Sequence, residues 1–358
     1  MKTAIVLGTR PEIIKMAPIV RELERQGRDH FILHTGQHYS RGLDKVFFEQ
    51  LGLPSSRHNL EVGSGSPAEQ TAKTLVGAER VLRQESPDVV LVEGDTNSVL
   101  GAAMAAAKLG IRVGHVEAGL RSYDRSMPEE INRKLTDHCS DYLFAPTEKA
   151  KEILLGEGIP EETIFVTGNT IVDAVHQNLE IAGDGAAALR DLGLKPDHYF
   201  VVTIHRQENV DNQARFASIL RGLDKVASEF GLPMIYPVHP RSRKKMHEFK
   251  LCPMNLRLID PLDYWSFLQL ERHARLILTD SGGVQEEACI LTVPCVTLRD
   301  NTERPETIEV GSNILGGTFP EKILECCRIM LGGGNNWRNP FGDGTAAKKI
   351  VDTLVARL

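Results

Sequence analysis

Short runs of apolar and β-branched residues alternate with longer amphipathic segments along the first half of the chain. This alternation is typical of strands and helices that follow one another in a parallel α/β sheet. The strands predicted in this half are residues 3–8, 30–34, 88–92, 112–116, 142–144 and 164–166. The pattern starts again in the second half, with strands predicted at 199–204, 234–238, 256–259, 275–279, 295–298 and 312–315. Two Rossmann-like units in series follow from this arrangement.

The boundary between the two units is predicted near Gly168. From there to about residue 198 the chain includes the small and polar segment 183–188, which suits a surface connection. The last segment, 345–358, has helical periodicity, and the pattern alone does not decide which unit it packs against. At 358 residues, the chain is long enough for two domains, each with its own core.

Composition and charge narrow the class of protein. Apolar residues make up 41% of the chain, and no apolar run approaches the roughly 20 residues that span a bilayer. The chain passes directly into a predicted strand, without the hydrophobic segment and cleavage site of an export signal, so we expect a cytoplasmic protein. A net charge of −6 argues against binding to nucleic acid, which needs clustered Lys and Arg.

The cysteines and histidines do not indicate a metal site. The six cysteines lack paired ligand spacing, and we expect reduced, mostly buried thiols at positions 139, 252, 289, 295, 326 and 327. The histidines and acidic residues also lack metal-ligand spacing on a common element. We therefore expect neither a metal nor a cofactor.

Polar residues follow the predicted strands of the first unit, at the sheet edge where open parallel sheets bind their ligands. After the first strand, residues 8–12 read Gly-Thr-Arg-Pro-Glu, and Arg10 offers a fixed cation there. The segment lacks the three spaced glycines of a dinucleotide site. A nicotinamide or flavin enzyme is accordingly disfavoured.

Three carboxylates are predicted at this same edge: Asp95 and Glu117 after two strands, and Glu129 behind Pro128. Crowding pushes the pKa values of carboxyl groups apart, which suits them to act as proton donor and proton acceptor. Each also has a structural interpretation. Asp95 would cap a helix that starts at Thr96, and Glu129 would favour a helix dipole. The residues alone leave both interpretations open.

The second unit carries charged residues and glycines at the equivalent strand ends. His205 and Arg206 follow its first strand, where a phosphate or acid–base role competes with a structural one. The strongest local signal is segment 278–288, a strand followed by two glycines and a helix whose free N–H groups favour a diphosphate. The residues offered to a ligand near this edge are Ser281, Gly282, Gly283, Glu287 and Arg304.

Taken together and in this order, these segments resemble the non-hydrolysing UDP-N-acetylglucosamine 2-epimerase family, and the resemblance covers nearly the whole chain. It rests on segments 8–12, 94–96, 114–121, 128–130, 236–239, 280–283, 302–306 and 339–344. The resemblance implies a GT-B fold of the α/β class, with two Rossmann-like domains whose parallel sheets face each other across a central cleft. The implied domains are residues 1–168 plus 343–358, and residues 169–342.

The resemblance also implies an activity: reversible epimerisation at C2 of UDP-N-acetylglucosamine to UDP-N-acetylmannosamine. UDP would leave and return through a 2-acetamidoglucal intermediate, and the product would feed the synthesis of cell-surface polysaccharide. Four different functions remain open: a 2-epimerase of UDP-2,3-diacetamido-glucuronate, a hydrolysing relative, a GT-B glycosyltransferase and a nucleotide-sugar sensor without catalysis. A homodimer is implied as well.

Site residues follow from the resemblance by motif position. Asp95, Glu117 and Glu129 are implied as acid–base groups, without assigning which of them removes the proton. His205 is implied as a catalytic or diphosphate-binding residue. The implied substrate contacts are Arg10, Lys15, Arg133, Arg206, Phe267 near the uracil, Ser281, Gly282, Gly283, Glu287 and Arg304.

The sequence departs from the common bacterial pattern in two places. The loop 121–128 is shorter than its usual bacterial counterpart. In the activator site of the family, Gln37 is kept and Gln70 is a second candidate, but Ser40 stands where another glutamine is usual. The serine at position 40 puts allosteric activation by the substrate in doubt.

Overall fold

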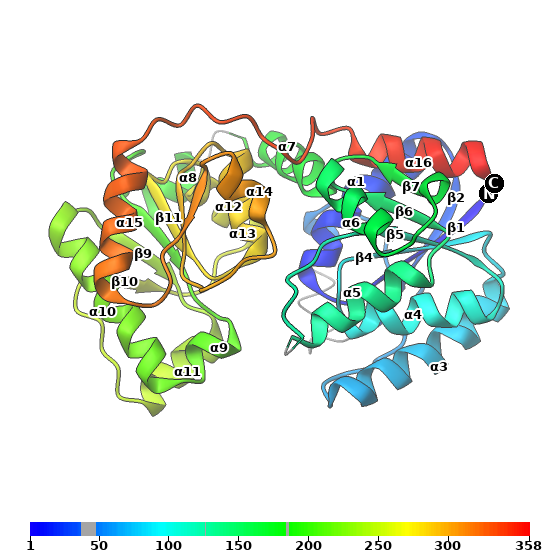
Figure 1. Cartoon of the computed structure of the whole chain (residues 1–358), viewed down its shortest axis with the longest axis horizontal. Helices are drawn as coiled ribbons and strands as arrows, with labels where there is room; N and C mark the ends of the chain where they lie inside the picture. Colours follow the sequence, from blue (N-terminus) through cyan, green and yellow to red (C-terminus); the bar gives the residue numbers. More distant parts are fainter. Residues whose placement is uncertain (37–47, 126, 184–185) are drawn as a thin grey trace. The chain divides into compact units, whose positions relative to one another are not determined.

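The protein is described from a computed structural model, which describes residues 1–36, 48–125, 127–183 and 186–358 (Figure 1). The chain forms two compact units. Unit 1 contains Met1–Gln177 together with Phe341–Leu358, and unit 2 contains Asn178–Pro340. Each unit has one parallel sheet with helices around it, so the predicted α/β class with two parallel sheets is confirmed.

Unit 1 has a seven-stranded sheet in the order β3-β2-β1-β4-β5-β6-β7. All its neighbouring strands are parallel. The chain order reverses between β1 and β4, and such a reversal opens a ligand crevice at the carboxyl ends of the two strands. The strands are β1 (Lys2–Leu7), β2 (Asp29–His34), β3 (His58–Asn59), β4 (Val89–Glu93), β5 (Arg112–Val116), β6 (Tyr142–Ala145) and β7 (Ile164–Val166).

The helices of unit 1 cover both faces of this sheet (Figure 1). One face packs under α3 and α4 through an apolar cluster that includes Val90, Val92 and Ala102. The helices of the unit are α1 (Arg10–Arg25), α3 (Pro67–Glu85), α4 (Asn97–Lys108), α5 (Pro128–His138), α6 (Glu148–Gly156), η1 (Glu161–Thr163), α7 (Thr170–Ala182) and α16 (Ala346–Arg357).

Unit 2 has a six-stranded parallel sheet in the order β10-β9-β8-β11-β12-β13, which reverses between β8 and β11. Its strands are β8 (Phe200–Thr203), β9 (Met234–Pro237), β10 (Leu256–Ile259), β11 (Leu276–Thr279), β12 (Cys295–Thr297) and β13 (Asn313–Leu315). Its helices are α8 (Ala186–Asp191), α9 (Gln207–Val210), α10 (Gln213–Phe230), α11 (Pro240–Glu248), α12 (Tyr264–Arg272), α13 (Gly282–Ile290), α14 (Pro305–Glu309) and α15 (Pro320–Gly332).

The central strands of unit 2 are almost entirely apolar because helices cover both faces of the sheet. Phe200 and Val202 point to one face, into a core that contains residues of α10 and α15. Val201 points to the other face, into a core with residues of α12 and α13. This placement explains why the predicted strands appear in the sequence as continuous β-branched runs rather than alternating ones.

The C-terminal helix α16 belongs to unit 1, where it packs beside α1 (Figure 1). The carboxylate of Asp173 in α7 accepts hydrogen bonds from the backbone N–H groups of Ala346 and Ala347, at the start of α16. By contacts, unit 1 therefore extends into α7 as far as Gln177. Among the described residues, no helix is both long and apolar enough to cross a membrane.

Candidate functional site

The first predicted motif forms the turn between β1 and α1. Gly8 is required there because a Cβ atom would lie 2.0 Å from Thr35 Oγ1. The buried carboxylate of Glu12 accepts hydrogen bonds from the backbone N–H groups of Gly8 and Thr9. Burial raises the pKa of Glu12 to about 7, although these hydrogen bonds act in the opposite direction. Arg10 is exposed at the first position of α1.

Glu117 follows β5 and is held by α1. Its two carboxylate oxygens each lie 2.8 Å from Nζ of Lys15, and it also accepts a hydrogen bond of 3.2 Å from Asn169 Nδ2. Lys15 Nζ lies 3.2 Å from a further carboxylate oxygen, Glu93 Oε1, at the end of β4. Lys15, Glu93 and Glu117 are all buried. The predicted substrate contact Lys15 is thus paired with carboxylates in this structure.

The backbone of Glu117 has a φ of +70°, which is the left-handed region that favours glycine. A buried cluster behind the turn holds this conformation. Asp137 lies 2.6 Å from His115 Nδ1 and 2.7 Å from Arg121 Nη2, and it accepts a hydrogen bond from the N–H of Gly119. Burial raises the pKa of Asp137, but His115 and Arg121 outweigh it and hold the pKa below its usual value.

Asp95 is held by α5. Its Oδ2 lies 2.6 Å from Arg133 Nη2, and its carbonyl oxygen accepts a hydrogen bond from Asn132. The structure therefore joins two predicted site residues, Asp95 and Arg133. Asp95 is not the N-cap of α4. The N-cap is Thr96, whose hydroxyl accepts a hydrogen bond from the N–H of Val99.

Glu129 and Glu130 lie in the first turn of α5 and have different surroundings. Glu129, the predicted acid–base residue, is half-buried at the start of the helix. Glu130 is buried and accepts hydrogen bonds from Arg133 and from the backbone and side chain of Ser122. These bonds outweigh burial and hold the pKa of Glu130 below its usual value. Glu130 thus fixes the loop before α5.

In unit 2, the buried side chain of Asp280 at the end of β11 organises the end of β8. Its carboxylate accepts hydrogen bonds of 3.0–3.1 Å from the backbone N–H groups of His205 and Arg206, and it also accepts one from Asn209. The imidazole Nδ1 of His205 lies 3.2 Å from Asp280 Oδ1. Together these contacts outweigh burial and keep the pKa of Asp280 below its usual value.

The predicted diphosphate motif forms the start of α13. Ser281 is its N-cap, and Gly282 and Gly283 are its first two residues. A Cβ at Gly282 would lie 2.7 Å from Glu303 Oε1, whereas the nearest atom to a Cβ at Gly283 is 3.9 Å away. Gly283 is therefore not required by packing, and its open space leaves the backbone accessible to a ligand.

A cavity of about 230 Å³ lies beside this helix start in unit 2. Three predicted site residues, His205, Phe267 and Ser281, line it together. The other residues of the lining are mostly apolar, and they are Thr203, Ile204, Pro237, His239, Pro261, Leu262 and Val284. A small apolar cavity next to free N–H groups suits a flat base or ring attached to a charged group.

The remaining predicted residues of unit 2 are tied to neighbouring side chains. Glu287 is buried in α13 and accepts a hydrogen bond of 2.9 Å from the hydroxyl of Tyr264. Arg304 is buried, with its Nε 2.6 Å from Glu286 Oε1. The Nη2 of Arg206 lies 3.1 Å from Glu303 Oε1, the same oxygen that a Cβ at Gly282 would meet. Arg206 therefore lies beside the start of α13.

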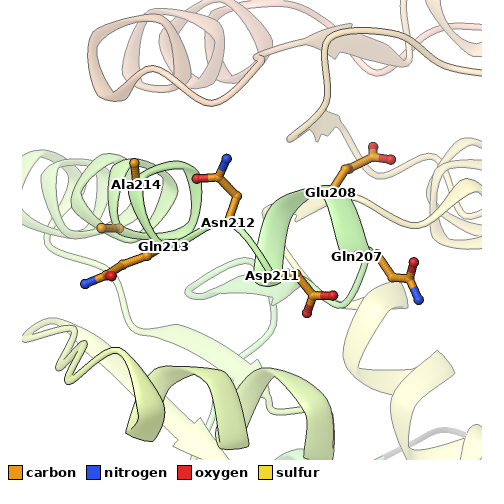
Figure 2. Close-up of a pocket in the computed structure, with 7 residues that line it drawn as sticks. Gln207, Glu208, Asp211, Asn212, Gln213 and Ala214 are labelled. Carbon is orange, nitrogen blue, oxygen red and sulfur yellow. The ribbon is translucent and has the colours of Figure 1, made fainter. Parts of the chain in front are cut away.

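A larger hollow of about 880 Å³ lies on the surface of unit 2, around α9 and the start of α10 (Figure 2). It is lined by Gln207, Glu208, Asp211, Asn212, Gln213, Ala214 and Ala217. In Figure 2, Glu208 and Asp211 point away from each other rather than toward a common centre. None of the predicted site residues lines this hollow, so its size does not make it the candidate site.

No group of three or more His, Cys, Asp or Glu side chains suited to a metal ion occurs within the described ranges. Four of the cysteines are buried: Cys289, Cys295, Cys326 and Cys327. The predicted activator residue Gln37 lies outside the residues that the structure describes, as does Ser40, which stands where another glutamine is usual. Gln70 accepts a hydrogen bond from Asn97 and donates one to the carbonyl of Gly63.

Sequence reasoning missed four residues that shape these sites: Glu12, Glu93, Asn169 and Asp280. Glu93 is visible in the sequence as a charged residue directly after four apolar ones. Asp280 is visible as the first residue of the glycine motif. The partners of both side chains come from distant segments, which a local pattern does not identify.

Known proteins resemble this chain over nearly its whole length. The family model described as "UDP-N-acetylglucosamine 2-epimerase" matches residues 21–355. A relative of that name from Methanocaldococcus jannaschii is 55% identical, over 99% of this chain and 99% of the relative. A UDP-2,3-diacetamido-2,3-dideoxy-D-glucuronate 2-epimerase from Pseudomonas aeruginosa is 37% identical over 99% of each chain.

Among solved structures, the M. jannaschii UDP-GlcNAc 2-epimerase in complex with UDP-GlcNAc and UDP has a TM-score of 0.94 at 55% identity. The match covers 99% of this chain and 100% of the other. This likeness confirms the GT-B fold class.

Proposed function

This chain belongs to the UDP-N-acetylglucosamine 2-epimerase family, and from that premise we propose that it interconverts UDP-N-acetylglucosamine and UDP-N-acetylmannosamine. The observation that carries the proposal is the full-length likeness to a 55% identical epimerase whose structure holds UDP-GlcNAc and UDP. A homodimer, which the family resemblance implies, and a cytoplasmic location, which the sequence pattern led us to expect, are part of the same proposal.

The proposed reaction breaks the bond from C1 to the diphosphate and removes the proton from C2, which gives a 2-acetamidoglucal and UDP. UDP then adds back to C1 while a proton is delivered to the opposite face of C2. The hydrogen on C2 lies beside no carbonyl, so it becomes acidic only as the leaving diphosphate builds positive charge on C1. Stabilising the departing diphosphate therefore lowers the barrier as much as a base does.

In this proposal unit 1 supplies the acid–base groups. Asp95 is oriented by Arg133, and Glu117 is oriented by Lys15 and Asn169. Glu129 is the third candidate, at the start of α5. A carboxylate that is held by defined partners is positioned for proton transfer without further reorganisation.

Unit 2 supplies the nucleotide site. The cavity beside α13 would take the uracil against Phe267, and the N–H groups of Gly282 and Gly283 would bind the diphosphate. His205 lines the same cavity and is held by Asp280. Glu287, oriented by Tyr264, would accept hydrogen bonds from the ribose hydroxyls.

The test is to incubate the protein with UDP-N-acetylglucosamine in D2O and follow the sugar by NMR. We expect deuterium at C2 and accumulation of intact UDP-N-acetylmannosamine. Free N-acetylmannosamine with UDP would indicate the hydrolysing activity instead. A parallel incubation uses UDP-2,3-diacetamido-glucuronate, the substrate type named for the 37% identical relative. Faster turnover of that sugar would reassign the substrate.

Two controls distinguish an epimerase from a glycosyltransferase and from a nucleotide-sugar sensor. A glycosyltransferase needs an acceptor, so turnover of the nucleotide sugar alone excludes it. In a nucleotide-sugar sensor without catalysis, Asp95→Asn would leave all measurable behaviour unchanged. We expect instead that this variant lowers kcat by about 100-fold or more and retains UDP binding. Activity that survives EDTA is the expected result for a site without a metal.

A further inference from the structure

Buried carboxyl groups crowd around the ammonium group of Lys15 in unit 1. Glu117 and Glu93 lie 2.8 Å and 3.2 Å from Lys15 Nζ. Glu12, from the same helix as Lys15, is close enough to act electrostatically on Glu93. All three carboxyl groups are buried, with Glu12 and Glu93 each 2% exposed. α1 therefore contributes Glu12 and Lys15, β4 contributes Glu93, and the turn after β5 contributes Glu117.

These groups cannot all be ionised without a large cost, because an uncompensated charge is expensive in a buried site. The hydrogen bonds indicate where a proton resides. Glu117 accepts two hydrogen bonds from Lys15 and one from Asn169. Glu12 accepts from two backbone N–H groups and from the hydroxyl of Thr96.

Glu93 has the weakest support of the three. Within the described part of the chain its buried Oε1 has no hydrogen-bond partner, although Lys15 lies nearby. Burial raises the pKa of Glu93 well above its usual value; Lys15 opposes this change, and Glu117 adds to it. We therefore assign the proton of the cluster to Glu93, whose side chain interacts with that of Glu117.

We propose that Glu93 is a positioning residue that carries a proton, shares it with Glu117, and thereby keeps Lys15 paired with Glu117. The inference rests on the proposed function, in which Glu117 transfers a proton to or from the sugar. If Glu93 lost its proton, its carboxylate would compete with Glu117 for Lys15. Glu117 would then lose a hydrogen-bond donor and part of the electrostatic stabilisation that the Lys15 ammonium group provides. Proton transfer at Glu117 would then slow.

The test compares Glu93→Gln with Glu93→Leu in the full-length protein. Glutamine keeps the shape and a hydrogen-bond donor but cannot ionise, whereas leucine keeps the approximate volume and removes the donor. We expect Glu93→Gln to keep kcat within about threefold of the parent at pH 7, and Glu93→Leu to lose about tenfold or more with KM for the nucleotide sugar nearly unchanged.

The pH profile of kcat is the decisive readout. In the parent protein, kcat should fall at high pH as Glu93 ionises, and this alkaline fall should be absent or shifted upward in Glu93→Gln. The proposal is overturned if the parent and Glu93→Gln share the same alkaline limb, or if Gln and Leu at this position are equally active. If Glu93 had a purely structural role, its replacement would not change the pH profile of kcat, and the two variants would not differ in activity.

A second measurement does not depend on activity. Folded Glu93 holds its proton to higher pH than the ordinary value of 4.5. Its contribution to stability is therefore fully present below that value, and it is lost as the pH rises toward the folded pKa. Urea unfolding at several pH values should show Glu93→Gln gaining stability relative to the parent as the pH rises. If the difference in unfolding free energy between Glu93→Gln and the parent stayed constant with pH, Glu93 would not hold the proton.

These two readouts keep the inference distinct from the proposed function. Absence of turnover by the parent protein would contradict the proposed function, while the unfolding series would still report on the proton. Glu85→Gln is the matched control, because Glu85 is a buried carboxylate that pairs with a lysine, Lys2, at the opposite end of β1. This variant should lose stability but keep the pH profile of kcat.

Discussion

At the scale of single residues, Asp280 shows how one buried carboxylate shapes a ligand-binding loop. It is fully buried, and its partners are the backbone N–H groups of His205 and Arg206, the imidazole of His205, and the amide of Asn209. These partners lie 71 to 75 positions away in the sequence. The carboxylate therefore joins the ends of β8 and β11, where the chain order of the sheet reverses.

We expect Asp280→Asn to destabilise unit 2 by about 2–4 kcal/mol, because an amide N–H2 would face N–H donors and leave a buried donor unsatisfied. The depressed pKa of Asp280 means that its contribution is present above its ordinary value of 3.8 and is lost as the pH falls through the folded pKa. Urea unfolding at pH 7 and at pH 3.5 measures both effects. The difference between variant and parent should shrink at the lower pH.

His205→Ala is the control for this prediction. It removes the imidazole, which is 41% exposed, but keeps the backbone N–H groups that donate to Asp280. It should cost less than about 1 kcal/mol, as expected for a partly exposed side chain. Equal losses in both variants would mean that the imidazole contact, and not the ordering of the backbone, carries the effect of Asp280.

At the scale of elements, the start of α13 combines a packing requirement with an open position. Gly282 faces Glu303, whose carboxylate is held by Arg206 and Arg299. Gly283 has no neighbour closer than 3.9 Å to an added Cβ. The two glycines are adjacent in sequence. Replacing each of them with alanine in turn therefore separates the packing requirement at Gly282 from the proposed ligand-binding requirement at Gly283.

Gly283→Ala should leave the melting temperature unchanged or slightly higher, because alanine favours the helix over glycine. If the diphosphate approaches this backbone as proposed, the added methyl group should weaken UDP binding about tenfold or more. Gly282→Ala should instead destabilise the protein by about 1–3 kcal/mol, because the methyl group displaces the Glu303 carboxylate from its two arginines. Calorimetric titration with UDP and thermal unfolding check both. Normal UDP affinity in Gly283→Ala would contradict a diphosphate site at this helix start.

The elements were largely predictable from the sequence, because helices on both faces make buried strands appear as uniform apolar runs. All twelve predicted strands are found, and the added strand β3 is only two residues long, too short to give a pattern. Helix starts were less predictable. The cap of α4 is Thr96 rather than Asp95, a choice that depends on Arg133 drawing the Asp95 side chain toward α5.

The candidate site was predictable only in part, because contacts between distant segments determine much of it. Motif positions named His205, Phe267 and Ser281 as site residues, and all three line one cavity of unit 2. The burial of Lys15 between Glu93 and Glu117 was not predictable, because it depends on three segments meeting at the carboxyl edge of the sheet. Local spacing gives the residues that reach this edge, whereas the charge balance among them emerges only when the strands are assembled.

At the scale of the whole molecule, the chain has two compact units with separate cores, and the last helix closes the first unit rather than the second. α16 buries Ile350, Val351 and Leu354, and its first turn is capped by Asp173. The stability of unit 1 therefore depends on the final residues of the sequence, while unit 2 is made from one continuous segment.

This organisation predicts two calorimetric transitions that respond to different changes. UDP at a hundredfold excess over its Kd should stabilise only the transition of unit 2, by about 2.7 kcal/mol, because the proposed nucleotide site lies in that unit. Deleting residues 346–358 should lower only the transition of unit 1, because it exposes the apolar face of α1 and leaves Asp173 without the N–H groups that it caps. Scanning calorimetry of the parent and the truncated chain, each with and without UDP, measures all four combinations. A single transition that both changes shift would mean that the two cores unfold as one cooperative unit.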